Sequence, residues 1–246
     1  MAILFEFLMR LAFGLALAML LTSPVKVTAG FFRNHLYVVL GLAFLAFLVV
    51  FGSMAGSVAL GAALLSYVGS VCYLYQSIRS GRVVLGLVSL ITLVGVLLGT
   101  PQLVDSVSPL ALVLWLSDGP TSGLLLGVTL GAMLLGHWYL NTPSMQMAPL
   151  RQLLALMVAA LFLRMLVCGI GLGATCMEGP IPAPWFVVLR WVTGLASPLV
   201  MAWMVERTLR IPNTQSATGI LYVAAVTVFT GELMSQLLSV TTTYPL

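Results

Sequence analysis

Long apolar runs separated by short polar breaks follow one another along the whole chain. A helix needs about 20 mostly apolar residues to cross a hydrocarbon core roughly 30 Å thick. The runs have this length, and turn-forming pairs such as Ser23-Pro24, Thr100-Pro101 and Thr142-Pro143 separate them. We therefore predict about eight transmembrane helices, over Ile3–Leu21, Phe31–Phe51, Met54–Gln76, Val83–Gly99, Thr121–Leu140, Gln152–Ala174, Trp185–Val205 and Ser216–Leu238.

One further apolar segment, Val107–Leu116, is too short to be counted as a span. Asp105 precedes it, and the polar sequence Ser-Asp-Gly-Pro at 117–120 follows it. A run of this length is typical of a re-entrant or interfacial helix. The chain has no internal repeat, linker or low-complexity tract, so residues 1–246 are expected to form a single polytopic transmembrane domain.

The composition restricts the class of protein further. The chain is 61% hydrophobic and only 7% charged, whereas an average soluble domain carries about 25% charged residues. A surface with so few charges rules out a soluble globule, and the unbroken apolar runs do not alternate as barrel strands do. We predict an all-α integral membrane protein whose surroundings are the lipid bilayer, with no face suited to nucleic acid.

The distribution of positive charge predicts the orientation of the bundle. If Val107–Leu116 does not span, every Lys and Arg near a connection falls on one side, and the opposite connections carry Asp105, Asp118 and Glu178 instead. Basic loops face the cytoplasm. We therefore expect a multi-pass protein of the cell (inner) membrane with both termini on the non-cytoplasmic side. The basic residues of the cytoplasmic side are Lys26, Arg33, Arg79, Arg82, Arg151, Arg207 and Arg210.

Ionisable residues inside spans are costly and usually face a partner, a cavity or a functional site. Glu6 and Arg10 are four residues apart, so they are expected to pair on one face of the first helix. Arg190 and Glu232 lie at similar depths and are expected to pair between helices, whereas Arg164 lies deeper and has no evident acidic partner. One interpretation is purely structural, with Arg164 bonding to carbonyls or to a neighbouring subunit. The other is a cofactor-binding site for a quinone headgroup, a propionate or a lipid phosphate.

The chain has two histidines, His35 and His137, and the predicted topology puts both near the cytoplasmic side. Two imidazoles from different helices are suited to axial ligation of haem b, although histidines at helix ends also commonly contact headgroups or loop carbonyls. We find no catalytic residues and no cluster with the spacing of metal ligands. Glycines at 123, 127 and 131 form a stripe that allows close approach of a helix, a subunit or a flat pigment.

Three classes of function remain. The first is a membrane subunit of a larger complex, an electron-transfer or other energy-converting assembly, which anchors other membrane subunits and shapes a quinone or haem pocket. The alternative is a small-solute or ion transporter or channel. An enzyme acting on lipid is the least supported class, because it requires clustered nucleophile or acid–base residues at one interface.

Overall fold

The computed structural model describes residues 2–100, 108–142, 145–181, 183–211 and 213–246. Within these residues, eight helical segments are long and apolar enough to cross a membrane. The seventh segment has three parts: α7, a π-helical turn and α8. The elements are α1 (Ala2–Leu21), α2 (Ala29–Val49), α3 (Met54–Leu74), α4 (Ile78–Leu98), α5 (Pro109–Asn141), α6 (Ala148–Glu178), α7 (Pro184–Trp191), the π-helical turn (Val192–Ala196), α8 (Ser197–Arg210) and α9 (Thr214–Ser239).

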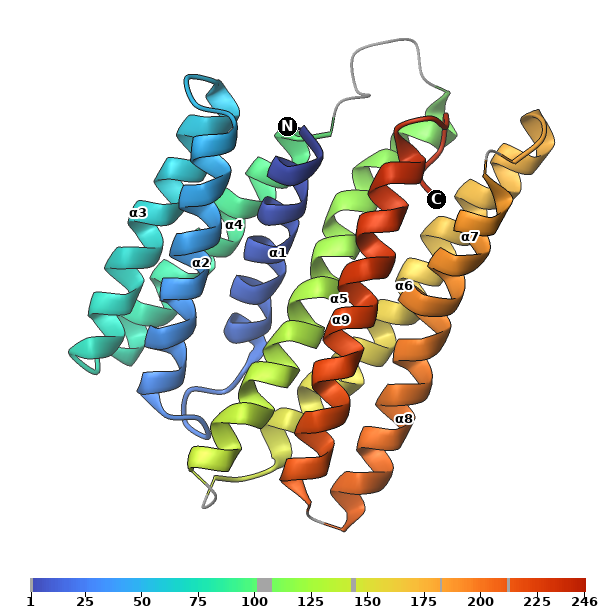
Figure 1. Cartoon of the computed structure of the whole chain (residues 1–246). Coiled ribbons are helices and arrows are strands. Elements are labelled where there is room, and N and C mark those ends of the chain that lie inside the picture. Colours follow the sequence, from blue (N-terminus) through green and yellow to red (C-terminus); the bar gives the residue numbers. More distant parts are fainter. Residues whose placement is uncertain (1, 101–107, 143–144, 182, 212) are drawn as a thin grey trace.

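Both chain termini lie at the same end of the helix bundle, as Figure 1 shows. The connections α1–α2, α3–α4, α5–α6 and α8–α9 lie at the opposite end. Lys26 belongs to the first of these connections, and the neighbouring first or last helical turns carry Arg33, Arg79, Arg82, Arg151, Arg207 and Arg210. We call this end the basic end and the other the terminal end. The gathering of these basic residues at one end, predicted from the sequence, is present in the fold. Of the acids predicted at the opposite connections, Asp118 lies inside α5 and Asp105 is outside the described residues.

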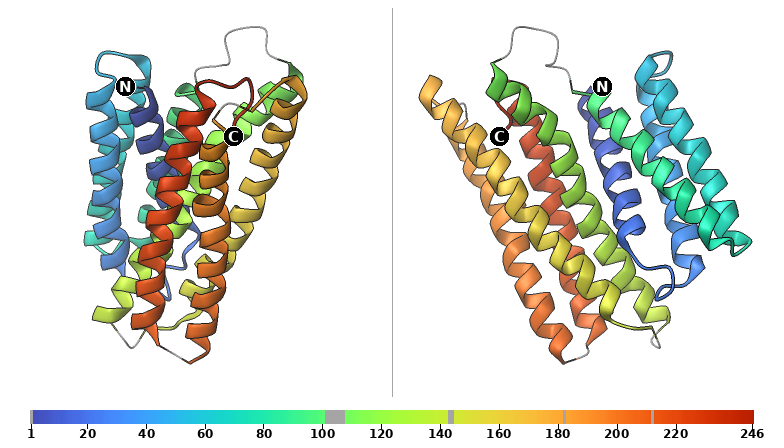
Figure 2. Two further views of the ribbon diagram at one scale, coloured as in Figure 1. Left: turned by 45° about the vertical axis from the view of Figure 1, so that its right-hand side comes forward. Right: turned by 180° about the vertical axis from the view of Figure 1, so that it is seen from behind.

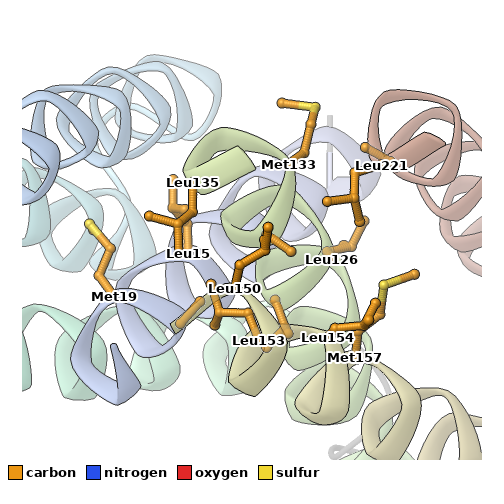
Figure 3. Packing of buried hydrophobic residues seen from close by; sticks show 14 of the residues in the cluster. Leu15, Met19, Leu126, Met133, Leu135, Leu150, Leu153, Leu154, Met157 and Leu221 are labelled. Atoms are coloured by element: carbon orange, nitrogen blue, oxygen red, sulfur yellow. The ribbon is translucent and has the colours of Figure 1, made fainter. Parts of the chain in front are cut away.

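The helices form two groups that meet along α1 and α5. On one side α2 and α4 pack against α1, and α3 packs against α2 and α4; on the other side α6, α7 and α8 lie around α5 and α9 (Figures 1 and 2). The main hydrophobic core extends through both groups, and Leu15, Leu126, Leu153 and Leu221 of α1, α5, α6 and α9 are among its buried side chains (Figure 3). The α1–α5 contact therefore holds the two groups together.

Glycine allows α1 and α5 to touch backbone to backbone. A Cβ added to Gly14 would collide with the carbonyl oxygen of Gly123, and one added to Gly127 would collide with the backbone of Gly14. Gly131, in the same stripe, faces Ala18 of α1. The glycine stripe therefore serves close packing inside this chain, which is one of the uses predicted for it.

The predicted separation of Val107–Leu116 from the fifth span is wrong. The structure places Leu110–Leu116 in the first turns of α5, which continues through Pro120 to Asn141; Val107 and Asp105 lie outside the described residues. Proline removes one backbone hydrogen bond of the helix. The Thr121 hydroxyl donates to the Ser117 carbonyl, at 2.7 Å, a type of side-chain bond that allows proline within spanning helices.

The seventh span departs from regular α-helix close to Gly194 and Pro198. Residues Val192–Ala196 form a π-helical turn, and α8 begins directly after it. At this turn the backbones of Gly194 and Gly231 of α9 are in contact, so a Cβ at either position would collide with the other residue. Such turns occur frequently at functional sites.

The last described residues fold back into the terminal end of the bundle. The Trp115 Nε1 group of α5 donates to the Thr243 carbonyl oxygen at 2.9 Å, and the Leu246 backbone N–H donates to Ser239 Oγ at 3.1 Å. Pro245 lies against Gly171 of α6, where a Cβ would collide with its carbonyl oxygen. The segment Thr241–Leu246 therefore fills space between α5, α6 and α9.

Candidate functional site

The candidate site is a continuous chain of six buried charged side chains in the half of the bundle nearer the terminal end. In order of contact it runs from Glu6 and Arg10 of α1, through Asp118 of α5, to Arg164 of α6, Glu232 of α9 and Arg190 of α7. Acids and arginines alternate along it, so three carboxylates face three guanidinium groups. We call it the charge network.

Arg164 is the centre of the charge network and is fully buried. Its Nη1 lies 2.6 Å from Asp118 Oδ1, and its Nη2 lies 2.9 Å from Glu232 Oε2. Its Nε donates to Glu232 at 3.1 Å, and its Nη2 donates to Ser235 Oγ at 3.1 Å. Each guanidinium nitrogen of Arg164 thus has a partner within the bundle.

The sequence-based expectation that Arg164 lacks an acidic partner is therefore wrong. It depended on placing Asp118 in a polar connection, whereas Asp118 is 2% exposed inside α5. Asp118 bonds to Arg164 on one side and to Arg10 Nη1 on the other, at 2.8 Å. Had positions 109–140 been interpreted as one long helix, Asp118 would have been recognised as a buried ionisable residue.

The two pairings predicted from the sequence are confirmed. Arg10 Nη2 lies 3.2 Å from Glu6 Oε2, one turn away on α1. Arg190 Nη2 lies 3.2 Å from Glu232 Oε1, between α7 and α9. Both pairs are part of the larger charge network, because Arg10 also bonds to Asp118 and Glu232 also bonds to Arg164.

Because the charge network is buried, its pairing strongly affects the stability of the fold. An unpaired charge in a low-dielectric interior is strongly unfavourable, and removal of one partner from a buried pair typically costs about 3–5 kcal/mol. Balanced charges with several hydrogen bonds per side chain avoid that cost. Because arginine does not lose its proton in proteins, a chain in which every second member is arginine is suited to a fixed electrostatic clamp and not to a proton relay.

Arg190 differs from Arg164 in having unused hydrogen-bond donors. Its Nη2 also donates to Cys168 Sγ at 3.2 Å, but its Nε and Nη1 have no partner among the described residues, although the side chain is fully buried. On α9, one turn beyond Glu232, both amide atoms of Gln236 are likewise buried without a described partner. Arg190 therefore retains capacity to bind an acceptor, and so does Arg10, whose Nε also has no partner among the described residues.

The two histidines contact different neighbours. His35 is buried, bonds through Nδ1 to the Phe31 carbonyl and lies against the Phe31 ring, with centroids 4.1 Å apart. His137 is exposed, and its Nδ1 lies 3.2 Å from the Tyr222 hydroxyl of α9. Trp138 lies 6.2 Å from the His35 ring, centroid to centroid. Axial ligation of haem by these residues stays a prediction.

Among the described residues, no three His, Cys, Asp or Glu side chains gather as metal ligands would. The chain matches no family model, and no curated protein or solved structure is similar to it.

Proposed function

We propose that the protein is a non-catalytic integral membrane subunit of a larger electron-transfer or other energy-converting assembly. It anchors other membrane subunits, and it lies in the inner membrane with its basic end toward the cytoplasm and both termini on the other side. The charge network supports this proposal, because it joins α1, α5, α6, α7 and α9 through fixed charges. Such a clamp gives a rigid platform for partners.

The short connections support the same proposal. At the basic end, α3 and α4 are separated by residues 75–77 and α8 and α9 by residues 211–213. These connections are too short to form an extramembrane catalytic domain. In this proposal the protein functions within the bilayer or through its partners.

In this proposal, Arg190 provides the contact to a redox cofactor. A quinone carbonyl or a haem propionate accepts hydrogen bonds, and the planar guanidinium offers several donors in fixed directions. Arg164 and Glu232 hold Arg190 in place, because Glu232 binds both arginines. Arg164 itself is fixed, since each of its guanidinium nitrogens has a partner. The bound group would supply the electron-transfer chemistry, and this chain would bind and orient it.

Isolation of the tagged protein, expressed at its native level and extracted in a mild detergent, tests the proposal. We expect a complex well above the 26.2 kDa of the chain, with other membrane polypeptides in stoichiometric amounts and an extractable quinone or a dithionite-reducible Soret band. A monomer that carries neither partner nor redox group would contradict the proposal.

A matched pair of variants separates the cofactor contact from assembly. Arg190→Lys keeps the positive charge beside Glu232 but removes the guanidinium fork, so we expect cofactor retention to fall while the complex persists. Arg79→Lys makes the same change at an exposed position of the basic end and is expected to have no effect. If both variants retain the cofactor, Arg190 is not part of the proposed site.

A transporter or channel is the second candidate function, and the π-helical turn Val192–Ala196 favours it. Transporters bind substrates beside interrupted helices, and this interruption lies directly after Arg190. Reconstitution into vesicles with a panel of labelled ions and small solutes tests this alternative. Flux above that of protein-free vesicles would support it, and absence of flux across the panel would count against it.

A further inference from the structure

A groove of about 620 Å³ opens on the outer surface of the bundle between α6 and α8. We propose that this α6–α8 groove is a binding site for one anionic diacyl phospholipid. An acyl chain lies in the groove, and the phosphate lies at the opening of the groove nearest the basic end of the bundle. The volume is within the usual range of ligand sites. The apolar walls are formed by Leu154, Ala155, Val158 and Phe162 of α6 and by Leu199 and Trp203 of α8.

The groove has the length of one membrane leaflet. Its lining on α6 extends from Arg151 near the basic end to Phe162, which is about 16 Å at 1.5 Å per residue. Half of a hydrocarbon core is about 15 Å thick. Beyond Phe162 side chains bridge the two spans, because Arg190 donates to Cys168 Sγ and Trp191 lies against Gly169.

The open end of the groove carries an excess of positive charge. Arg151 and Glu206 line it, and the Arg207 guanidinium lies 5.3 Å from the centre of the Trp203 ring, at the edge of the groove. Arg210 lies one turn from Glu206, with a Nε–Oε1 distance of 3.9 Å. Three arginines thus lie at or near this end against a single carboxylate, which favours a phosphate group over a neutral or cationic ligand.

Arg151 joins the two walls at this end. Its Nη2 donates to the Leu209 carbonyl oxygen of α8 at 2.9 Å, so its guanidinium is held across the opening. Arg151 also lies in the first turn of α6, where the helix dipole attracts an anion. An anionic headgroup at this point would be attracted by both the arginine and the dipole of α6.

A lipid fits the shape of the groove better than a transmembrane helix of a partner or of a second copy. A spanning helix would require an apolar groove along the whole depth of the bilayer, about 30 Å. The α6–α8 groove ends where the side chains of Arg190 and Trp191 of α7 reach α6. Charge at its open end and closure at mid-depth correspond to the headgroup and the chain end of one lipid.

Fluorescence quenching at Trp203 tests the proposal on the full-length protein in phosphatidylcholine vesicles. Phosphatidylglycerol or phosphatidylcholine with brominated acyl chains is added, and the Trp203 signal is the difference between wild type and Trp203→Phe. We expect half-maximal quenching at about a tenfold lower mole fraction of phosphatidylglycerol, the preference given by one to two arginines beside an anionic headgroup.

Two pairs of variants locate the binding site. Ala155→Phe fills the groove and is expected to abolish the preference, whereas Ala159→Phe, at an exposed position of α6 outside the lining, should retain it. Arg207→Gln should reduce the preference about fivefold, and Arg79→Gln should leave it unchanged. Equal quenching by both lipids in wild type, or a preference that survives Ala155→Phe, would overturn the proposal. Crosslinking of residue 155 to a second copy or to another polypeptide would do so as well.

Discussion

Arg10 of α1 bonds to Asp118 of α5, with 2.8 Å between Nη1 and Oδ2. This contact links the two groups of helices through paired charges, because Asp118 also bonds to Arg164 of α6. It forms beside the glycine contact of the same two helices, where Gly123 faces the Arg10 backbone. The close approach of the backbones brings the two side chains within reach of each other.

A double-mutant cycle measures this link. Arg10→Met and Asp118→Asn are each expected to lower the free energy of unfolding in detergent, because each leaves a buried partner uncompensated. The double variant should lose less than the sum of the two, with a coupling free energy of about 1–3 kcal/mol. Strict additivity would show that the contact carries no energetic coupling.

Arg164→Ala should destabilise the bundle far more than Arg79→Ala. The first change leaves Asp118 and Glu232 without their shared partner in the interior, at a cost of about 3–5 kcal/mol. Arg79 is exposed at the basic end, where its removal is expected to change stability by less than about 0.5 kcal/mol. Thermal unfolding in detergent and the yield of folded protein give the comparison. Equal melting temperatures and yields would contradict the central position of Arg164.

Gly127→Ala should prevent normal packing of α1 on α5. The added Cβ would collide with the Gly14 backbone, and neither backbone can move without displacing its helix. Overpacking of a filled interior costs about 1–3 kcal/mol or more. Gly86→Ala on α4 is the matched control, because no atom lies within 4 Å of its added Cβ. Similar unfolding temperatures of the two variants would argue against the backbone contact.

Gly171→Ala should displace the segment Thr241–Leu246. Its Cβ would collide with the Pro245 carbonyl oxygen, whereas the Cβ added by Gly173→Ala on the same helix meets nothing within 4 Å. Limited proteolysis after Tyr244 is expected to become faster in Gly171→Ala and to stay at the wild-type rate in Gly173→Ala. Unchanged cleavage of both variants would mean that the segment does not depend on this contact.

The natural cysteines report the orientation of the chain. Cys176 is exposed in the last turn of α6 at the terminal end, Cys72 is partly exposed near the basic end of α3, and Cys168 is buried. An impermeant maleimide should label Cys176 in intact cells and reach Cys72 only after permeabilisation. Cys176→Ser should remove the signal from intact cells. Labelling of Cys72 from outside would reverse the proposed orientation.

Much of the fold could be predicted because the signals were local. The approximate positions of eight spans follow from the length of each apolar run, and the Glu6–Arg10 pair follows from a spacing of one helical turn. The Arg190–Glu232 pair could be predicted from depth, since both residues lie close to the same end of antiparallel helices. The orientation in the membrane and the cofactor contacts of His35 and His137 stay predictions.

The sequence by itself determined how many helices are long and apolar enough to cross a bilayer, because the hydropathy of a segment is a property of that segment alone. Only the tertiary structure decided that Asp118 lies within a helix and completes the charge network between Arg10 and Arg164. A short polar stretch before a proline is typical of a turn when it is solvated. Here it stays helical because neighbouring helices supply the charges that make its burial favourable, and the order of residues along the chain does not reveal which helices will be neighbours.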